Sequence, residues 1–264
     1  MSGKLRDNVS RIKEPSPLGK SLFVGLRAAD VFWQYNLLTR GWGLRLIEKL
    51  GGQAVSPLHV FNPLSVTRLQ PYYGLVSLLS IGSSVKQIIH IIFVSEQSMS
   101  LGSGVAIPAF NTIYNTVNTL LSLWAVTSPV SSVPELGTLT DTFSSSPLVA
   151  VGLGAYTVGL LVEAVSEFQR KGFKQDPKNQ GKPYGGGLFS LATNINYGGY
   201  AVWRAGYAMV CGGFAWAATT FGFFFYDFAF RGVPVLEEYM TQRYGDAYKQ
   251  IKSRVRYSLI PGIW

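Results

Sequence analysis

The chain has 264 residues, of which 47% are hydrophobic and only 14% are charged, against roughly 25% charged residues in soluble domains. Its mean hydropathy is +0.20, so a soluble enzyme is not favoured. One cysteine, Cys211, excludes an intramolecular disulfide and a cysteine-built zinc site, and two histidines do not favour a histidine metal centre. We therefore predict no metal site.

The net charge of +9 comes from lysines and arginines that cluster outside the apolar segments. They cluster in residues 4–20, 170–182 and 243–256. Such a distribution is typical of cytosolic loops of membrane proteins. Because aromatic and basic residues do not alternate as on RNA-binding surfaces, we predict no nucleic-acid partner.

The N-terminal third contains no strong membrane span. Residues 1–20 are basic and polar, lack a cleavable signal pattern, and are predicted to form a mobile cytosolic arm. Residues 21–50 combine apolar pairs with charges and predict a weakly hydrophobic helix, either on the membrane or inside a bundle. Residues 51–71 hold the turn-forming residues Gly51, Gly52, Pro57 and Pro63 and predict a connector.

Membrane-length apolar segments follow. They are residues 72–94, 109–130, 147–165 and 197–230, with a Ser/Thr/Pro-rich loop at 131–147. The last segment is too long for one span, so we predict a helical hairpin that turns near Cys211-Gly212-Gly213. The sequence thus predicts an all-α polytopic membrane bundle of about five to six transmembrane helices, with a basic cytosolic loop and C-terminal tail.

Two pairs of ionisable residues fall inside or at the end of these spans with helical spacing. Lys86 and His90 are four apart, and so are Glu163 and Glu167, so each pair shares a helix face. Charges at membrane depth usually face a cavity. The alternatives are a Lys86 that snorkels or meets a neighbouring carbonyl, and two carboxylates that are solvated neighbours of Arg170 and Lys171.

The C-terminal segment resembles a known superfamily. It reads SEFQRKGFKQDPKNQGKPYGGGLFSLATNINYGGYAVW, and the chain closes with LEEYMTQRYGDAYKQIKSRVRYSLIPGIW. These stretches resemble the C-terminal half of the steroid 5-alpha reductase superfamily, which includes the isoprenylcysteine carboxyl methyltransferases. The resemblance covers about residues 150–264 and implies a reductase-like membrane domain there. Composition and hydropathy divide the rest of the chain into an arm at 1–20 and membrane helices and connectors at 21–149.

Four positions depart from the family pattern. Thr193 and Asn194 stand where Arg-His is usual, Ile195 replaces a proline, and Tyr200 replaces a glutamate. The corner from Leu188 to Trp203 therefore lacks its usual charged groups, and no catalytic residue is named from the motif.

The resemblance implies a cofactor pocket of cationic, amide and aromatic side chains. The candidate cofactor-binding residues are Gln169, Lys174, Asp176, Asn179, Asn196, Tyr197, Tyr244, Tyr248, Arg254 and Tyr257. Gly185 to Gly187 and Gly198-Gly199 are expected to let the backbone approach the ligand closely.

The function implied is that of a membrane oxidoreductase of the endoplasmic reticulum. It would use NADPH to reduce a C=C bond conjugated to a carbonyl in a sterol, fatty-acyl or other lipid. Two alternatives stay open. One is an isoprenylcysteine-type methyltransferase that uses S-adenosylmethionine, and the other is a non-catalytic relative that binds a lipid or the cofactor.

Overall fold

The computed structural model describes residues 7, 10–131 and 138–264. Lys4 of the predicted arm and Glu135 of the predicted 131–147 loop lie outside these residues. Within them every named element is helical, and β-structure is limited to three isolated bridges. The elements are α1 (Pro17–Thr39), α2 (Trp42–Lys49), α3 (Pro57–Val60), α4 (Pro71–Ile89), η1 (His90–Val94), α5 (Leu101–Leu123), α6 (Leu139–Ser145), α7 (Pro147–Gln175), η2 (Pro177–Asn179), η3 (Gly187–Ser190), α8 (Ile195–Asp227), η4 (Phe228–Gly232), α9 (Val233–Tyr244) and α10 (Asp246–Arg254).

The long helices begin where the sequence supplies helix-start residues. Pro17, Pro71 and Pro147 occupy the first turns of α1, α4 and α7, where a missing N–H costs nothing. Ser100 accepts a hydrogen bond from the Ser103 N–H at 3.1 Å and caps α5. The first apolar segment, predicted at 72–94, therefore coincides with α4 and η1, whereas α5 begins before the predicted 109 and ends before 130.

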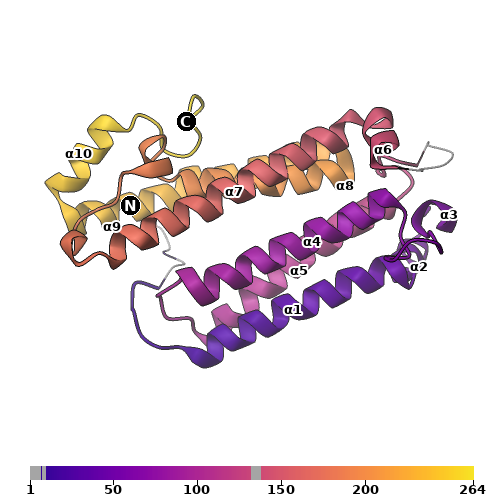
Figure 1. Ribbon diagram of the computed structural model, residues 1–264, viewed down its shortest axis with the longest axis horizontal. Helices are drawn as coiled ribbons and strands as arrows, with labels where there is room; N and C mark the ends of the chain where they lie inside the picture. The colour runs from indigo at the N-terminus through magenta and orange to yellow at the C-terminus, as the bar shows by residue number, and fades with distance from the viewer. Residues whose placement is uncertain (1–6, 8–9, 132–137) are drawn as a thin grey trace.

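Two groups of helices form the bundle (Figure 1). Helix α1 packs on α4 and α5, and α7 packs along α8. The start of α1, α9, α10 and the C-terminus lie at one end, and α2, α3 and α6 lie at the other. All three basic segments therefore approach the same end of the bundle.

Helix α8 contains the predicted hairpin. Gly213 has φ 72° and ψ −166°, which interrupts the helix. The two arms then run side by side, since the Tyr200 ring centroid lies 5.1 Å from that of Phe224 and the Tyr197 centroid lies 4.8 Å from that of Phe228. The predicted turn near Cys211-Gly213 is confirmed.

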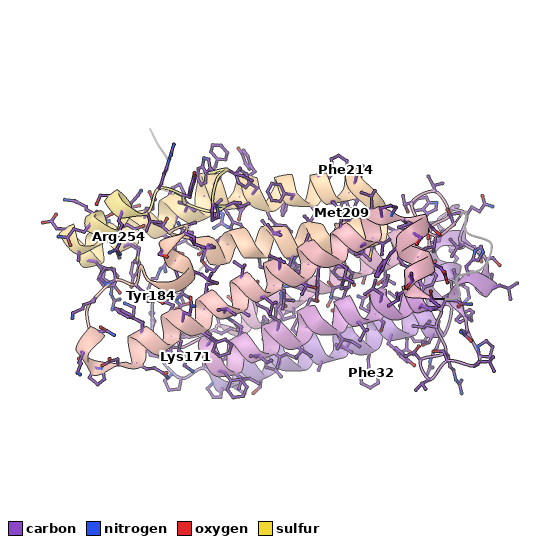
Figure 2. The ribbon with its side chains drawn as sticks, turned by 45° about the horizontal axis from the view of Figure 1, so that its top comes forward. Phe32, Lys171, Tyr184, Met209, Phe214 and Arg254 are labelled. Carbon is purple, nitrogen blue, oxygen red and sulfur yellow. The ribbon has the colours of Figure 1, made fainter. Side chains whose placement is uncertain are left out.

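Three helical segments are long and apolar enough to cross a membrane: Pro71–Val94, Pro147–Gln175 and Ile195–Tyr244. Outward apolar side chains, such as Phe32 on α1 and Phe214 on α8, point away from the bundle (Figure 2) and are 73% and 67% exposed. These features indicate an integral membrane protein. The count of five to six spans stays a prediction.

The structure corrects one prediction, for the loop at 131–147, and decides between two alternatives for residues 21–50. Part of the predicted 131–147 loop is the short helix α6, because Thr138 accepts a hydrogen bond from the Asp141 N–H at 3.1 Å and caps it. Of the two alternatives for residues 21–50, the structure has the second: Arg27, Asp30 and Gln34 of α1 are buried inside the bundle.

Candidate functional site

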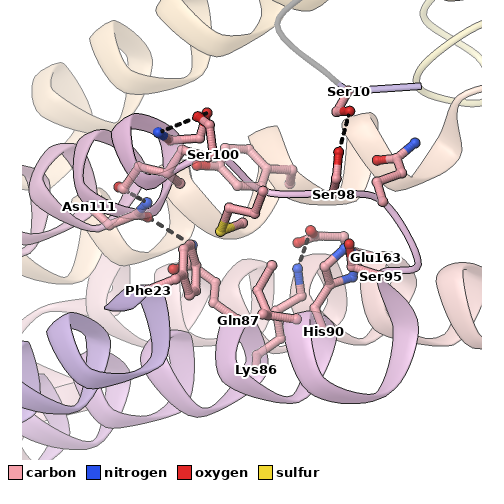
Figure 3. A pocket seen from close by; sticks show the side chains of 16 residues that line it. Ser10, Phe23, Lys86, Gln87, His90, Ser95, Ser98, Ser100, Asn111 and Glu163 are labelled. Carbon is pink, nitrogen blue, oxygen red and sulfur yellow. Dashed lines mark hydrogen bonds and ion pairs between the residues drawn. The ribbon is translucent and has the colours of Figure 1, made fainter. Parts of the chain in front are cut away.

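A cavity of about 390 Å³ lies between α1, α4, α5, α7 and α8, beneath the segment that joins η1 to α5 (Figure 3). Its size falls in the range of roughly 300–1,000 Å³ that is typical of small-molecule sites. The lining residues are Ser10, Phe23, Lys86, Gln87, His90, Ile91, Ser95, Gln97, Ser98, Met99, Ser100, Ser103, Ile107, Asn111, Glu163 and Tyr200.

An ion pair crosses this cavity. Lys86 of α4 and Glu163 of α7 point toward one another and pair, and the Trp203 indole N–H donates to Glu163 Oε2 at 2.7 Å. Lys86 therefore neither snorkels nor meets a carbonyl, and Glu163 is not a solvated neighbour of Arg170. His90 lines the same cavity, as its spacing from Lys86 predicts.

Tyr200 and Arg204 form a second polar group at the cavity wall. The Tyr200 hydroxyl accepts hydrogen bonds from Arg204 Nε at 3.0 Å and Arg204 Nη2 at 2.8 Å. Arg204 Nη2 also donates to Asn111 Oδ1, and Asn111 accepts another hydrogen bond from Gln87 Nε2 at 2.8 Å. Sequence reasoning singled out Tyr200 but not Arg204, although their i and i+4 spacing marks a shared helix face.

Asn196 belongs to a third buried group. Its amide Nδ2 donates to Glu167 Oε1 at 2.7 Å, and Glu167 pairs with Arg170. Asn196 is 6% exposed, and the helix cap of α8 is Asn194 rather than Asn196. The amide thus anchors the first turn of α8 to α7.

Helix α5 contributes polar residues that sequence reasoning missed. Asn115 Nδ2 donates to Asp30 Oδ2 at 2.7 Å, and Thr119 Oγ1 donates to Gln34 Oε1 at 2.7 Å. The signal was present: Asn111, Asn115 and Thr119 recur every four residues, so they share one helix face.

A second cavity of about 370 Å³ opens at the basic end of the bundle. Its lining residues are Phe173, Asn179, Lys182, Pro183, Tyr184, Gly185, Gly186, Ala247, Ile251 and Arg254. Asn179 and Arg254, two candidate cofactor residues, thus lie in one site. Arg254 Nη2 reaches the Gly185 carbonyl at 3.4 Å, which is a weak contact.

Lys174 and Tyr244 meet close to this second cavity. Lys174 Nζ donates to the Tyr244 hydroxyl at 3.0 Å and lies 4.8 Å from the centre of its ring. It also donates to the Lys182 carbonyl. These two candidate cofactor residues therefore tie α7 to α9 and to the loop before Tyr184.

The other candidate cofactor residues are dispersed through local structure. Gln169 Oε1 accepts from the Leu188 N–H at 2.9 Å, and Asp176 Oδ1 accepts from the Lys178 N–H at 2.9 Å. Burial raises the pKa of Tyr248 to about 12, Tyr197 stacks on Phe228, and the Tyr257 carbonyl accepts from the Thr193 N–H at 2.9 Å. Their cofactor role stays a prediction.

Three of the glycines that were expected to let the backbone approach a ligand instead lie against other parts of the protein. A Cβ at Gly198 would lie 2.1 Å from the Leu259 carbonyl oxygen, and one at Gly199 would lie 2.8 Å from the Glu163 nitrogen. A Cβ at Gly185 would lie 2.7 Å from the Ile251 side chain. These glycines let neighbouring segments of the protein itself approach, and no ligand is needed to explain them.

Residues of the N-terminal arm lie over the mouth of the first cavity. The Ser10 and Ser98 hydroxyls are 2.9 Å apart (Figure 3), and the Ser98 N–H donates to the Ile12 carbonyl at 2.9 Å. The hydrogen bond from Lys13 lowers the pKa of Glu96. The described part of the arm thus contacts the segment that joins η1 to α5.

Together, the helices and the buried ionisable residues define a helical membrane protein with an internal polar cavity. A family model described as a protein of unknown function, DUF1295, matches residues 94–255. The chain belongs to this family. It is also 37% identical over 245 residues to a protein named probable O-methyltransferase ustE, from Ustilaginoidea virens, with 91% of this chain and 84% of that protein covered.

Proposed function

We propose that the protein is a membrane-embedded O-methyltransferase, which transfers a methyl group from S-adenosylmethionine to an oxygen atom of an apolar molecule. The observation that carries the proposal is the cavity, in which His90, Lys86, Glu163 and Tyr200 converge inside an apolar bundle. Ionisable groups at membrane depth are costly and are generally functional. The name of the 37% identical relative supports the reaction class.

The side chains that line the first cavity have different roles in this proposal. Phe23, Ile107 and Met99 offer apolar surface to the hydrocarbon part of the acceptor. His90 holds an imidazole in the wall of the cavity, and a neutral imidazole accepts a proton from an acidic hydroxyl. The Lys86–Glu163 pair stays neutral as a unit, so it adds polarity without net charge.

The methyl donor fits the second cavity by its chemistry. Arg254 has only a weak protein partner there and suits a carboxylate, Asn179 offers an amide, and Tyr184 offers an aromatic face. When bound, S-adenosylmethionine supplies an electrophilic methyl group. We extend the same proposal to the dispersed residues Gln169, Asn196 and Tyr257 as supports of this end of the bundle.

We further propose six crossings, made by α1, α4, α5, α7 and the two arms of the hairpin from α8 to α9. An even number puts the basic arm, residues 170–182 and the tail on one face of the membrane, and basic loops favour the cytosolic face.

We keep the division of the chain into 1–20, 21–149 and 150–264, with the first cavity lying mainly between the last two regions. From the family resemblance we assign the endoplasmic reticulum and a lipid-like acceptor.

A second candidate is the NADPH-dependent reduction of a C=C bond conjugated to a carbonyl. The resemblance of residues 169–181 to the reductase branch favours it, as do the cations near the second cavity, Lys174, Lys182 and Arg254. Tyr200 would then donate to the carbonyl oxygen. A non-catalytic relative is the remaining alternative.

The test is thermal unfolding of the detergent-purified protein with each cofactor, because a ligand of the folded state raises the melting temperature. We expect S-adenosylmethionine and S-adenosylhomocysteine to raise it and NADPH to leave it unchanged. Arg254→Ala is expected to abolish the shift, whereas Lys252→Ala on the same helix, which pairs with Glu237, keeps it. A shift with NADPH alone would favour the reductase, and no shift with any cofactor would favour the non-catalytic relative.

A further inference from the structure

Arg204 carries a buried positive charge that is not balanced by an ion pair. Its side chain is 1% exposed, and no carboxylate of the described residues lies within ion-pair distance of it. The other buried cations, Arg27 and Lys86, each pair with a carboxylate. A lone guanidinium in a low-dielectric bundle is costly unless an anion joins it.

The surroundings of Arg204 compensate its charge only in part. Its carbon Cζ lies 4.4 Å from the centre of the Trp203 ring, and Nη1 is buried without a hydrogen-bond partner in the described part of the chain. Cation–π contacts with aromatic rings contribute modestly. Among the described residues, the two N–H groups of Nη1 therefore lack a partner, and the charge of Arg204 is not neutralised by a carboxylate.

The direction of the hydrogen bonds identifies where that ligand binds. A guanidinium only donates, so the Tyr200 oxygen is the acceptor of both hydrogen bonds from Arg204, at 3.0 and 2.8 Å. The Tyr200 proton then has to go to another acceptor, and the hydrogen bonds between described residues include none. Since Tyr200 lines the first cavity, its O–H is a donor to the contents of that cavity.

We propose that Tyr200, backed by the charge of Arg204, binds an oxyanion of the acceptor molecule. The acceptor is thus a compound with an acidic oxygen, a phenol, enol or carboxylic acid, that binds as its anion, and an aliphatic alcohol or a neutral ether is excluded. This inference rests on the proposed function in taking the first cavity as the acceptor site. Arg204 acts through Tyr200 and is a positioning residue.

The anion satisfies the electron balance of methyl transfer. The oxygen supplies the electron pair of the new O–CH₃ bond, and the S–CH₃ bond breaks with its pair left on sulfur. The negative charge of the acceptor and the positive charge of the donor disappear together, and the acceptor proton has gone to His90. A site of low dielectric favours such a loss of charge.

A phenol whose anion absorbs visible light tests the proposal without any cofactor. We choose 4-nitrophenol, titrated in the presence of the detergent-purified protein and in the same micelles alone. The charged groups that face Tyr200 are Arg27 and Asp30 of α1, Lys86 of α4, His90 of η1, Glu163 of α7 and Arg204 of α8 itself. Only Arg204 among them is an unpaired cation.

We expect the pKa of the bound 4-nitrophenol to fall by about 1–3 units, the size of shift that a nearby opposite charge produces. The methyl ether 4-nitroanisole should bind at least about tenfold more weakly, which corresponds to the loss of one charge-assisted hydrogen bond. A parallel binding measurement with 4-nitrobenzoate distinguishes a phenol from a carboxylic acid as the acceptor. Stronger binding than that of 4-nitrophenol identifies a carboxylic acid.

Tyr200→Phe keeps the aromatic ring and should remove most of the pKa shift of the bound 4-nitrophenol. Arg204→Met should also reduce this shift, and Arg204→Lys, which keeps the charge, should reduce it less. Tyr226→Phe, on the same helix but 67% exposed and outside the cavity lining, should behave as wild type. An unshifted probe, or a shift that Tyr200→Phe retains, would overturn the proposal. A shift without methyl transfer from S-adenosylmethionine would leave the oxyanion site in place and reject the O-methyltransferase function instead.

Discussion

The two groups of helices are packed internally in different ways. Helices α1 and α5 meet through a buried polar network, in which Arg27 pairs with Asp30 at 2.8 Å and Asp30 accepts from Asn115 at 2.7 Å. Helices α7 and α8 meet through glycines, because a Cβ at Gly206 would lie 2.3 Å from the Tyr156 nitrogen. The α1–α5 interface is mainly hydrogen-bonded, although Gly19 and Gly104 also meet there. The α7–α8 interface is mainly a contact between glycines and backbone, with two hydrogen bonds to Glu163 and Glu167 beside it.

The glycine interface is periodic in the sequence. Gly152 and Gly159 of α7 are seven residues apart, as are Gly199 and Gly206 of α8, so each pair lies on one helix face. A Cβ at Gly159 would lie 2.5 Å from the Trp203 nitrogen. Small residues at close helix crossings are characteristic of membrane bundles.

The difference bears on why α1 and α5 are not among the three helical segments that are long and apolar enough to cross a membrane, although residues 109–130 were predicted as an apolar segment. Glycine leaves the apolar character of α7 and α8 intact, and both belong to segments that are long and apolar enough to span a membrane. The polar residues of α1 and α5 lower the hydropathy of helices that have 23 residues each. Buried polar residues lower the mean hydropathy of a helix, whereas glycine changes it little.

The largest expected effect is on the polar interface. Asp30→Ala leaves Arg27 buried without its carboxylate, and breaking a buried pair in this way costs about 3–5 kcal/mol of unfolding free energy. Chemical denaturation in detergent measures this loss. Replacing both partners, Arg27→Met with Asp30→Leu, should cost less than Asp30→Ala alone; an equal or larger cost would mean that the pair itself provides net stabilisation.

The glycine interface should tolerate even one methyl group poorly. Gly206→Ala forces α7 and α8 apart, and overpacking of this kind costs about 1–3 kcal/mol. Gly154→Ala on α7 is the matched control, since a Cβ there meets nothing within 4 Å, and it should be neutral or slightly stabilising. Equal melting temperatures for both variants would contradict the close crossing.

A single hydrogen bond of the polar interface should contribute less. Thr119→Val removes the donor to Gln34 Oε1 while it keeps the side-chain shape. Hydrogen bonds between membrane helices average about 0.6 kcal/mol, with a maximum of about 1.7, so we expect a loss in that range by the same denaturation assay. Thr157→Val, whose hydroxyl is bonded only to the Leu153 carbonyl of its own helix, is the control.

The smallest effect concerns the arm that lies beside the polar half. The pKa of Glu96 is lowered by its hydrogen bond from Lys13, so this contact stabilises above the ordinary pKa of a glutamate and is lost as the pH falls through the lowered value. The pair is exposed and contributes at most about 1 kcal/mol. Labelling of a Ser10→Cys variant, divided by the labelling rate of a free thiol at the same pH, should become relatively faster below that pH, and Glu96→Gln should remove this change.

The sequence by itself determined the membrane character, the apolar segment at 72–94 and the hairpin that turns at Gly213. These features depend on composition over about twenty residues, or on a backbone angle that only glycine adopts easily. The departure at Tyr200 was also visible, because it is a property of one position. The single-face pattern of Asn111, Asn115 and Thr119 was readable as well, although it gives no partner for any of them.

Only the tertiary structure decided which polar groups meet. Lys86 and Glu163 are 77 residues apart, and Asn111 reaches Arg204 from another helix. Local spacing gives the face of a helix but not the helix that it faces. The candidate cofactor residues, which were grouped by motif, are distributed over a cavity, two helix junctions and several turns, because neighbours in the chain diverge once α7, α8 and the tail fold against each other.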